Sequence, residues 1–427
     1  MPMINLMCVK AEPKYNGESE KSGKNAQSSS SSSTASNICH GSKLKYLPPD
    51  LWASIIINLP VKTLLRFRCV CKSWCSIIDH PDFAYTNLKV CKIDSNETKI
   101  VALESLGEYG TKGSALTIRQ GKTLEETAHI FKSTDSYDLI GRCNELLLLN
   151  RYVHYPNFKT EMRLWNPSIR KSLLIPTCPL VDAKCLLGFS PRCKDYKIVA
   201  MLSKQSKIHV AVYTLREKTW SVRNNCLDVI SSYVELMFTA RFYKQKAAFY
   251  FQGAVYWFGM DLRGSHLAVY TLSRQNYLVS FNFDSERFTL LEIPQETKEA
   301  SRSYLRFLFI LGESLAIFSI TKKRSGIWVL EQGSGKGVWT NWFSGHSTSH
   351  AYKFFRLSYS CSPLSPLLYY ESDGDSCFFF GKNSYNIATG LVTELGKSRY
   401  NFLDLGMYME SLLLWKGYGA EDMASVP

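Results

Sequence analysis

The sequence lacks any long uninterrupted apolar run. The longest candidate, Phe307 to Ile320, is broken by Glu313 and is shorter than the ~18–20 residues that a transmembrane helix requires. Residues 1–9 show no basic start followed by an apolar segment of ~7–15 residues, so a secretory signal peptide is not expected. A membrane or secreted protein is therefore disfavoured, and the sequon at Asn96 is expected to be a chance match.

A dense basic block is also missing. The formal net charge is +14 over 427 residues, but Lys and Arg are scattered along the chain apart from short runs such as Lys322 to Arg324. Nucleic-acid binding needs basic residues gathered on one face, and scattered charge is typical of a solvated surface. A nucleic-acid partner is therefore not expected, whereas an acidic partner stays open.

The cysteines do not form a recognisable disulfide framework or metal site. There are 13 of them, an odd number, and they are dispersed, which favours reduced thiols and a location in the cytoplasm, the nucleus or both. The densest group is Cys69, Cys71, Cys75 and His80. On a single helix Cys69 would point ~200° away from Cys71, so this group is not expected to bind zinc.

Catalytic motifs are likewise scarce. Residues 333–337 imitate a phosphate-binding loop, yet Leu330 stands where the first Gly is needed and Gly337 replaces the Ser or Thr that would hold Mg²⁺, so a hairpin loop is expected. A turn is expected at Asp373 to Asp375. The eight histidines are isolated, and no nucleophile-elbow pattern occurs. Neither a catalytic residue nor a cofactor is predicted, although spacing alone leaves a catalytic cysteine open.

What is present indicates a mainly β protein. Aromatic residues reach 13% of the chain, which favours pleated surfaces, and the length favours two folded units plus a tail. Residues 1–43 are rich in Ser, Lys, Gly and Asn, so a disordered tail is expected there. From about Ile100 onward, short apolar strands alternate with turn residues in a degenerate repeat of roughly 40–50 residues. This period favours propeller blades, with the number of blades left open.

A helical segment precedes the strands. Within residues 47–88, apolar side chains recur at helical spacing in three segments, which predicts three short helices. The first runs to Leu59 and is stopped by Pro60, the second is Val61 to Phe67, and the third is about Cys69 to Asp79, before His80-Pro81. Their apolar side chains are too numerous for three short helices to bury. Leaving several of them in water would forgo several kcal/mol at ~25 cal/mol per Å². Either the β domain or a partner protein is therefore expected to cover the surplus.

The same segment resembles the F-box of plant F-box proteins. The residues that carry the likeness are Leu47-Pro48-x-Asp50-Leu51, Leu59-Pro60-Val61-Lys62, Leu64 through Trp74 and Pro81-x-Phe83. The resemblance implies docking onto the Skp-type adaptor of an SCF-type cullin-RING ubiquitin ligase. It also implies that the main adaptor contacts are Leu47, Pro48, Ile55, Leu59, Pro60, Leu64, Val70 and Trp74.

The remainder is similar to the F-box-associated domain, which is related to kelch-like propellers. Leu164-Trp165-Asn166-Pro167 matches its most recognisable motif, whereas Arg142 and Glu145 depart from the Ser and Gly usual in an earlier turn. Trp165, Tyr213, Trp257, Phe281 and Trp328 are interpreted as core rather than ligand contacts. The domains expected are the tail (1–43), the F-box (44–90), the irregular propeller (91–399) and a C-terminal tail (400–427).

The resemblance implies a non-catalytic substrate receptor. The F-box would bind the adaptor and, through it, cullin and RING subunits, while surface loops of the propeller would hold an unidentified target protein for ubiquitination and proteasomal degradation. Two alternatives stay open. One is a propeller that senses a small molecule or glycan, and the other is a nucleic-acid-associated regulator, each with an F-box that controls its turnover.

Overall fold

The computed structural model describes residues 49–94, 99–106, 113–120, 124–153, 159–204, 207–223, 234–235, 248–261, 277–297, 305–331, 337–348, 351, 368–372, 375–380, 383–394, 401–414 and 421–422. The chain divides into two units, residues 1–48 and 49–427. The first unit lies outside the described residues, and with it lie the predicted tail and two predicted adaptor contacts, Leu47 and Pro48. Among the described residues, no helix is long and apolar enough to cross a membrane.

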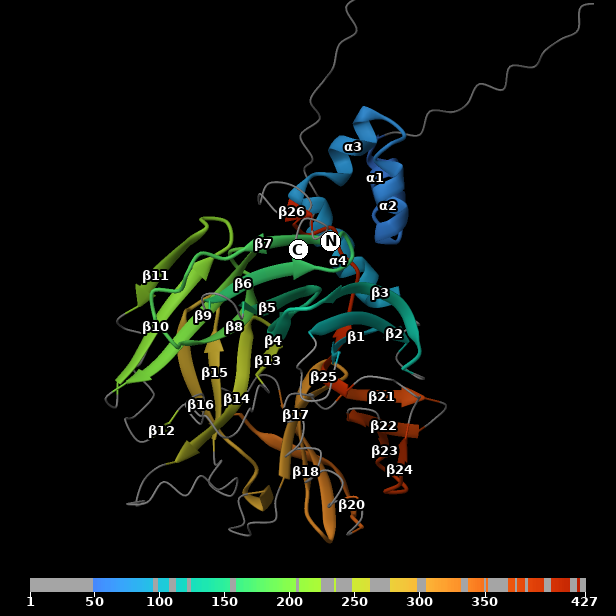
Figure 1. Cartoon of the computed structure of the whole chain (residues 1–427). Helices are drawn as coiled ribbons and strands as arrows, with labels where there is room; N and C mark the ends of the chain where they lie inside the picture. Colours follow the sequence, from blue (N-terminus) through green and yellow to red (C-terminus); the bar gives the residue numbers. More distant parts are fainter. Residues whose placement is uncertain are drawn as a thin grey trace, which may run out of the picture. The chain divides into compact units, whose positions relative to one another are not determined.

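Four helices lead the second unit (Figure 1): α1 (Pro49–Ile56), α2 (Val61–Phe67), α3 (Lys72–Ile78) and α4 (Pro81–Asp94). The first three coincide with the expected segments, but a fourth follows where none was predicted. Proline lacks the N–H that the first helical turn leaves unpaired, and its fixed φ suits that position. Pro81 therefore begins α4 as well as ending the preceding segment.

The strands that the structure describes form six antiparallel sheets (Figure 1). The first three sheets contain β1 (Lys99–Ser105), β2 (Ser114–Gln120) and β3 (Glu126–Ser133), then β4 (Ser136–Cys143), β5 (Leu146–Val153), β6 (Lys159–Asn166) and β7 (Lys171–Leu174), then β8 (Lys184–Ser190), β9 (Asp195–Lys204), β10 (Lys207–Thr214) and β11 (Thr219–Arg223).

The next three sheets contain β12 (Val234–Glu235), β13 (Phe249–Phe251), β14 (Ala254–Asp261), β15 (Tyr277–Asn282) and β16 (Arg287–Glu292), then β17 (Leu305–Leu311), β18 (Ser314–Ile320), β19 (Arg324–Leu330) and β20 (Trp339–His346), then β21 (Leu368–Ser372), β22 (Asp375–Phe380), β23 (Asn383–Asn386) and β24 (Val392–Glu394). A short 3-10 helix, Gln295–Thr297, precedes β17.

The sheets are arranged as a six-bladed propeller-like domain. Strands of neighbouring sheets lie side by side: β4 lies beside β8, β8 beside β14, and β17 beside β21. The first blade is closed by β25 (Asn401–Tyr408), which pairs with β1 and also lies beside β4 and β21. A further short strand, β26 (Glu421–Asp422), pairs with β7.

This closure changes one expected boundary. Residues 400–427 were expected to form a C-terminal tail, whereas Asn401–Tyr408 belongs to the first sheet. Leu405 and Tyr408 are buried there, and Leu412 to Leu414 are buried in the core as well. This pairing could not be predicted, because the partner strand β1 is about 300 residues away and periodicity within a strand says nothing about its distant partner.

The repeated aromatic residues are core, as predicted. Trp165, Tyr213, Trp257, Phe281 and Trp328 are all buried. They pack with other rings, for example Trp257 edge-on to Phe288, with 6.2 Å between the ring centroids. Such tilted and edge-to-face pairs add to the free energy gained by burial.

Two connections were expected to be turns: residues 333–337, which resemble a phosphate-binding loop, and Asp373 to Asp375. Residues 332–336 lie outside the described residues, but the flanking strands β19 and β20 pair directly, with Leu330 opposite Trp339. Likewise Ser372 pairs with Asp375 between β21 and β22. The register of these strands confirms a hairpin in both places.

The atypical turn between β4 and β5 has a physical explanation. Asn144 takes the left-handed conformation that such a turn needs, with φ 54°. Arg142 donates from Nη1 to the carbonyl of Leu405 on β25, at 2.6 Å. Glu145 is fully buried and accepts a hydrogen bond from the Tyr196 hydroxyl, at 2.8 Å. The two unusual side chains thus link this blade to the blades on either side.

Candidate protein-binding surface of the N-terminal helices

Three large apolar side chains of the helical segment remain exposed. Leu51 is 50% exposed, Ile55 49% and Val70 62%. Pro60 is exposed as well. Leu51 and Ile55 are four residues apart on α1, so they lie on one face of that helix. Exposed large apolar residues on such a small helical unit mark a candidate surface for binding another protein.

The other predicted contact positions are covered to different degrees. Leu64 is completely buried, so within this chain its side chain belongs to the helical core. Leu59 and Trp74 are partly buried. The Trp74 ring packs against Trp52 and Phe67, with centroid separations of 5.3 Å and 5.0 Å. Packing among the helices therefore covers several of the predicted adaptor contacts. Of those contacts, Ile55, Pro60 and Val70 remain exposed.

Leu51 was not among the predicted contacts, although it is exposed beside Ile55. The signal in the sequence is the spacing of four residues between Leu51 and Ile55 on α1, whereas the structure shows that the neighbouring Ile56 is the buried residue. Spacing alone could not decide which apolar stripe faces the core. That choice depends on the packing of α2 to α4 against α1.

Polar contacts fix the ends of the helices. The Arg68 guanidinium at the end of α2 makes two hydrogen bonds to Asp79 at the end of α3, Nε to Oδ1 at 2.5 Å and Nη2 to Oδ2 at 2.9 Å. The hydrogen bond to Asp79 is the main cause of the raised pKa of Arg68. A charge-assisted, two-point contact of this kind orients both partners. It therefore fixes α2 relative to α3, on either side of the exposed Val70.

Asn87 on α4 holds the turn that contains Pro60. Its side chain is fully buried, and Nδ2 donates to the carbonyl oxygens of Ile57 and Leu59, at 2.6 Å and 3.3 Å. These carbonyls follow the end of α1, where no further turn of the helix supplies backbone N–H groups to bond them. The fourth helix thus determines how the chain passes from α1 to α2.

The cysteines of this region serve as local structure. Cys71 is the N-cap of α3, and its sulfur accepts a hydrogen bond from the Trp74 amide at 3.5 Å. Cys75 donates to Asp79 at 3.4 Å. Cys69 and Cys71 precede α3, so the expectation that they share one helix with Cys75 was wrong. Within the described ranges, no group of three or more His, Cys, Asp or Glu could hold a metal ion.

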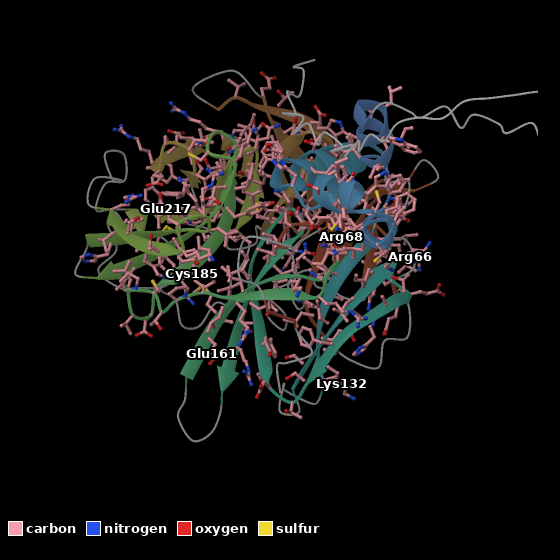
Figure 2. The ribbon with its side chains drawn as sticks, turned by 90° about the horizontal axis from the view of Figure 1, so that it is seen from above. Arg66, Arg68, Lys132, Glu161, Cys185 and Glu217 are labelled. Atoms are coloured by element: carbon pink, nitrogen blue, oxygen red, sulfur yellow. The ribbon has the colours of Figure 1, made fainter. Side chains whose placement is uncertain are left out.

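The fourth helix also contacts the β domain. The Tyr85 ring stacks on Phe189 of β8 with centroids 5.4 Å apart and an interplanar angle of 26°. The Phe189 ring in turn packs against the Tyr196 ring, with 4.9 Å between the ring centroids. Buried residues of both regions share one apolar cluster, which includes Phe83 and Leu187. Figure 2 shows Arg66 and Arg68 on the helices, viewed from above, with the strands beneath them.

Family models match both regions of this chain. A model described as F-box domain matches residues 44–85, and one described as F-box associated beta propeller domain matches residues 83–394. The chain belongs to the F-box-associated β-propeller family. Both the helical segment and the β domain of this F-box protein therefore agree with the resemblance found in its sequence.

The chain is similar to F-box proteins of Arabidopsis thaliana. An F-box/kelch-repeat protein is 26% identical over 246 residues, covering 54% of this chain and 64% of that protein. The F-box protein CPR1 is 21% identical over 351 residues, covering 76% of this chain and 77% of CPR1. The chain thus spans less than two thirds of the first relative.

Proposed function

We propose that this chain is a substrate-recognition subunit of an SCF-type cullin-RING ubiquitin ligase. The F-box binds a Skp-type adaptor, and through it cullin and RING subunits, while loops of the propeller hold a target protein. The chain performs no bond chemistry itself. It holds a target lysine near the ubiquitin thioester, which replaces a bimolecular encounter with a local one. We place this activity in the cytoplasm, the nucleus or both.

The exposure of three large apolar side chains on the N-terminal helices, Leu51, Ile55 and Val70, is the observation that carries the proposal. These side chains lie on the segment matched by the F-box model and are half or more exposed. Exposed apolar residues are costly to retain unless a partner covers them. A constitutive adaptor would satisfy this requirement and would leave the propeller free for the target.

The test is binding of the full chain to a plant Skp-type adaptor, co-expressed and measured by calorimetry. Val70→Asp places a charge in the proposed interface, and we expect affinity to fall at least ~10-fold, about 1.4 kcal/mol. The double variant Leu59→Ala with Pro60→Ala should also weaken binding. Wild-type chain is expected to bind with micromolar or tighter affinity.

Val222→Asp is the matched control. Val222 is a valine of similar exposure, 54% against 62% for Val70, but it lies on β11 of the propeller. Its substitution should leave adaptor affinity unchanged. A folded wild-type chain that does not bind, or equal loss in both valine variants, would reject the proposal.

A further inference from the structure

A tryptophan lies exposed on the outer strand of the fifth blade. Strand β20 is the last in the order of its sheet, and Trp342 within it is 49% exposed. Trp220 and Trp339 are partly buried instead, and each donates from its indole N–H to a backbone carbonyl of a neighbouring segment, at 2.8 Å and 2.7 Å. The Trp342 indole makes no hydrogen bond to any residue that the structure describes. Packing within the blade therefore does not account for this side chain.

Trp342 occupies a β-bulge. Ile327 on β19 pairs with Phe343, and the residue after Ile327 pairs with Asn341, so Trp342 has no partner across the ladder. Such bulges re-aim a side chain and weaken pairing at a sheet edge, but weaker pairing alone needs no tryptophan. The Asn341 side chain accepts from the Ser344 hydroxyl at 3.0 Å and donates to the Phe343 carbonyl at 3.4 Å. These bonds hold the backbone on both sides of the exposed ring.

Three consecutive basic residues lie at one end of the same sheet. Lys322 and Lys323 form part of the turn between β18 and β19, Arg324 begins β19, and all three are exposed. The Thr321 hydroxyl accepts from the amides of Lys323 and Arg324, at 3.2 Å and 2.9 Å. The Lys323 carbonyl accepts from the Ser347 amide at 3.0 Å, which ties the turn to the chain that leaves β20.

No carboxylate balances these charges within the two strands and the turn. Residues 314–330 and 338–348 contain neither Asp nor Glu. None of the three basic side chains forms a salt bridge with a residue in the described part of the chain. Arg324 pairs with His346, four residues from Trp342 along β20. At ~3.3 Å per residue, the basic turn therefore lies ~10–13 Å from the exposed ring.

This edge lies apart from the N-terminal helices. Those helices share an apolar cluster with strands of the second and third blades. The buried apolar residues of β17 and β18 belong to another cluster, in which the structure places no residue of the four helices. A protein held at β20 therefore does not have to displace one that is bound to the helices.

The exposed groups suit a protein segment of defined chemistry. Tryptophan and arginine are enriched among the residues that dominate protein–protein binding energy. An apolar side chain of a partner can pack on the ring, and carboxylates can face the basic turn. Single-stranded nucleic acid stacks successive bases on several aromatic side chains. Trp342 is the one fully exposed aromatic residue of β20, whose residues are all described, so a protein fits better.

We propose that Trp342, Lys322, Lys323 and Arg324 form the surface that holds the target protein. The ligand is an extended segment with a large apolar side chain and, about three to four residues along, two or more carboxylates, because an extended chain advances ~3.3 Å per residue. This inference rests on the receptor function proposed above and assigns the target surface of that receptor.

Selection from a phage library of random dodecapeptides tests the chemistry of the ligand. The bait is the full wild-type chain. We expect the enriched peptides to share an apolar residue three to four positions away from paired acidic residues. Binding of the best synthetic peptide should weaken as salt is added, because exposed charges are screened. Enrichment of peptides without this pattern would overturn the proposal.

Two apolar substitutions test the position of the site. Trp342→Ala should weaken binding of the selected peptide at least ~10-fold, as expected for an aromatic residue at the centre of an interface. Leu391→Ala is the control, because Leu391 is 65% exposed but lies in a turn of the sixth blade, between β23 and β24. It should leave peptide affinity unchanged. Equal effects of the two substitutions would place the peptide elsewhere and reject this surface.

Charge reversal tests the basic turn in the same way. Lys322→Glu combined with Lys323→Glu should lower peptide affinity at least ~10-fold at low salt. Arg192→Glu combined with Lys194→Glu changes the net charge equally, on an exposed turn of the third blade, and should have little effect. A peptide whose acidic residues are replaced by lysine should regain affinity for the Lys322→Glu, Lys323→Glu chain. Equal losses in the two double variants would contradict a local contact.

Lysine acetylation of the wild-type chain gives a result that does not depend on whether the variants fold. Saturating peptide should slow the reaction of Lys322 and Lys323 with acetic anhydride several-fold and leave Lys194 unchanged, as measured by mass spectrometry. Protection of Lys194 alone, or of none of the three, would overturn the proposed surface.

Adaptor binding separates this inference from the function on which it rests. Trp342→Ala and the Lys322→Glu, Lys323→Glu chain should bind a plant Skp-type adaptor as wild type does. Lost adaptor affinity in these variants would make the edge an adaptor contact and overturn its assignment to the target. A wild-type chain that binds no adaptor would reject the receptor function, whatever the peptides show. Displacement of the selected peptide by oligodeoxythymidylate would assign the edge to nucleic acid instead.

Discussion

Asn87 joins α4 to the turn after α1, and its removal should loosen the F-box. Asn87→Ala removes two partly buried hydrogen bonds, which the Asn87 side chain donates to the carbonyls of Ile57 and Leu59. Leaving such carbonyls unpaired costs about 1 kcal/mol each, the low end of the range for buried groups. We expect peptides from α1 and α2 to exchange amide hydrogen faster by one to two orders of magnitude, measured by hydrogen–deuterium exchange of the full chain.

Asn58→Ala is the control for this prediction. Asn58 also donates from Nδ2 to a backbone carbonyl, that of Ser54 at 2.6 Å, but the contact is exposed and water can replace it. Asn58→Ala should therefore change the hydrogen–deuterium exchange of peptides from α1 and α2 very little. Equal exchange in the two variants would show that Asn87 does not hold the turn.

Asn87 also shows what the sequence could and could not predict at this scale. The positions of α1 to α3 followed from apolar spacing and from Pro60, and the exposed Ile55 and Val70 lie on the segment that the resemblance identified. The hydrogen bond from Asn87 spans 30 residues. No local pattern specifies such a distant partner, so neither this contact nor α4 as a separate helix could be predicted.

At the scale of elements, Glu286 ties neighbouring blades together. It lies in the turn between β15 and β16, and its carboxylate accepts from Lys197 of β9 at 2.7 Å and from Arg223 of β11 at 2.5 Å. Burial alone raises the pKa of Glu286, but the hydrogen bonds from Arg223 and Lys197 outweigh it and the pKa is lowered. A lowered pKa means that the stabilisation is present above the unfolded pKa of about 4.3 and is lost as the pH falls through the folded value.

Glu286→Gln should therefore remove a pH-dependent part of the stability. At pH 7 we expect the free energy of unfolding to fall by about 1.5–3 kcal/mol, the usual contribution of hydrogen bonds to charged groups. Between pH 7 and pH 3, the thermal midpoint of the wild type should drop more than that of the variant. Glu217→Gln, on an exposed turn of the third blade (Figure 2), should behave like wild type at both pH values. Parallel pH curves for wild type and Glu286→Gln would contradict this account.

At the scale of the whole molecule, β25 closes the ring of blades. Its pairing with β1 buries Leu405 and Tyr408, and the Asn166 side chain donates to the carbonyls of Ser411 and Leu413, at 3.1 Å and 2.8 Å. A chain that ends at residue 399 should lose all these contacts and expose the edges of two blades. We expect it to be aggregated or rapidly degraded in limited proteolysis.

A chain that ends at Asp422 is the control, because it retains every strand that the structure describes. It should elute as the full chain does in size-exclusion chromatography and should resist protease equally. A stable, monodisperse chain ending at residue 399 would show that β25 is dispensable. The sequence predicted blades from their repeated strands, but blade closure depends on a pairing between distant segments.

This closure sets an order of events during synthesis. A ribosome adds about 5–20 residues per second, so roughly 16–64 s pass between completion of the F-box near residue 90 and completion of β25 at Tyr408. During that interval the helices are already outside the ribosome, while the first blade still lacks its innermost strand. Under the function proposed above, an adaptor would therefore meet its docking site on a nascent chain whose propeller is still open. Quality control of the propeller would then act on a chain that already carries the adaptor.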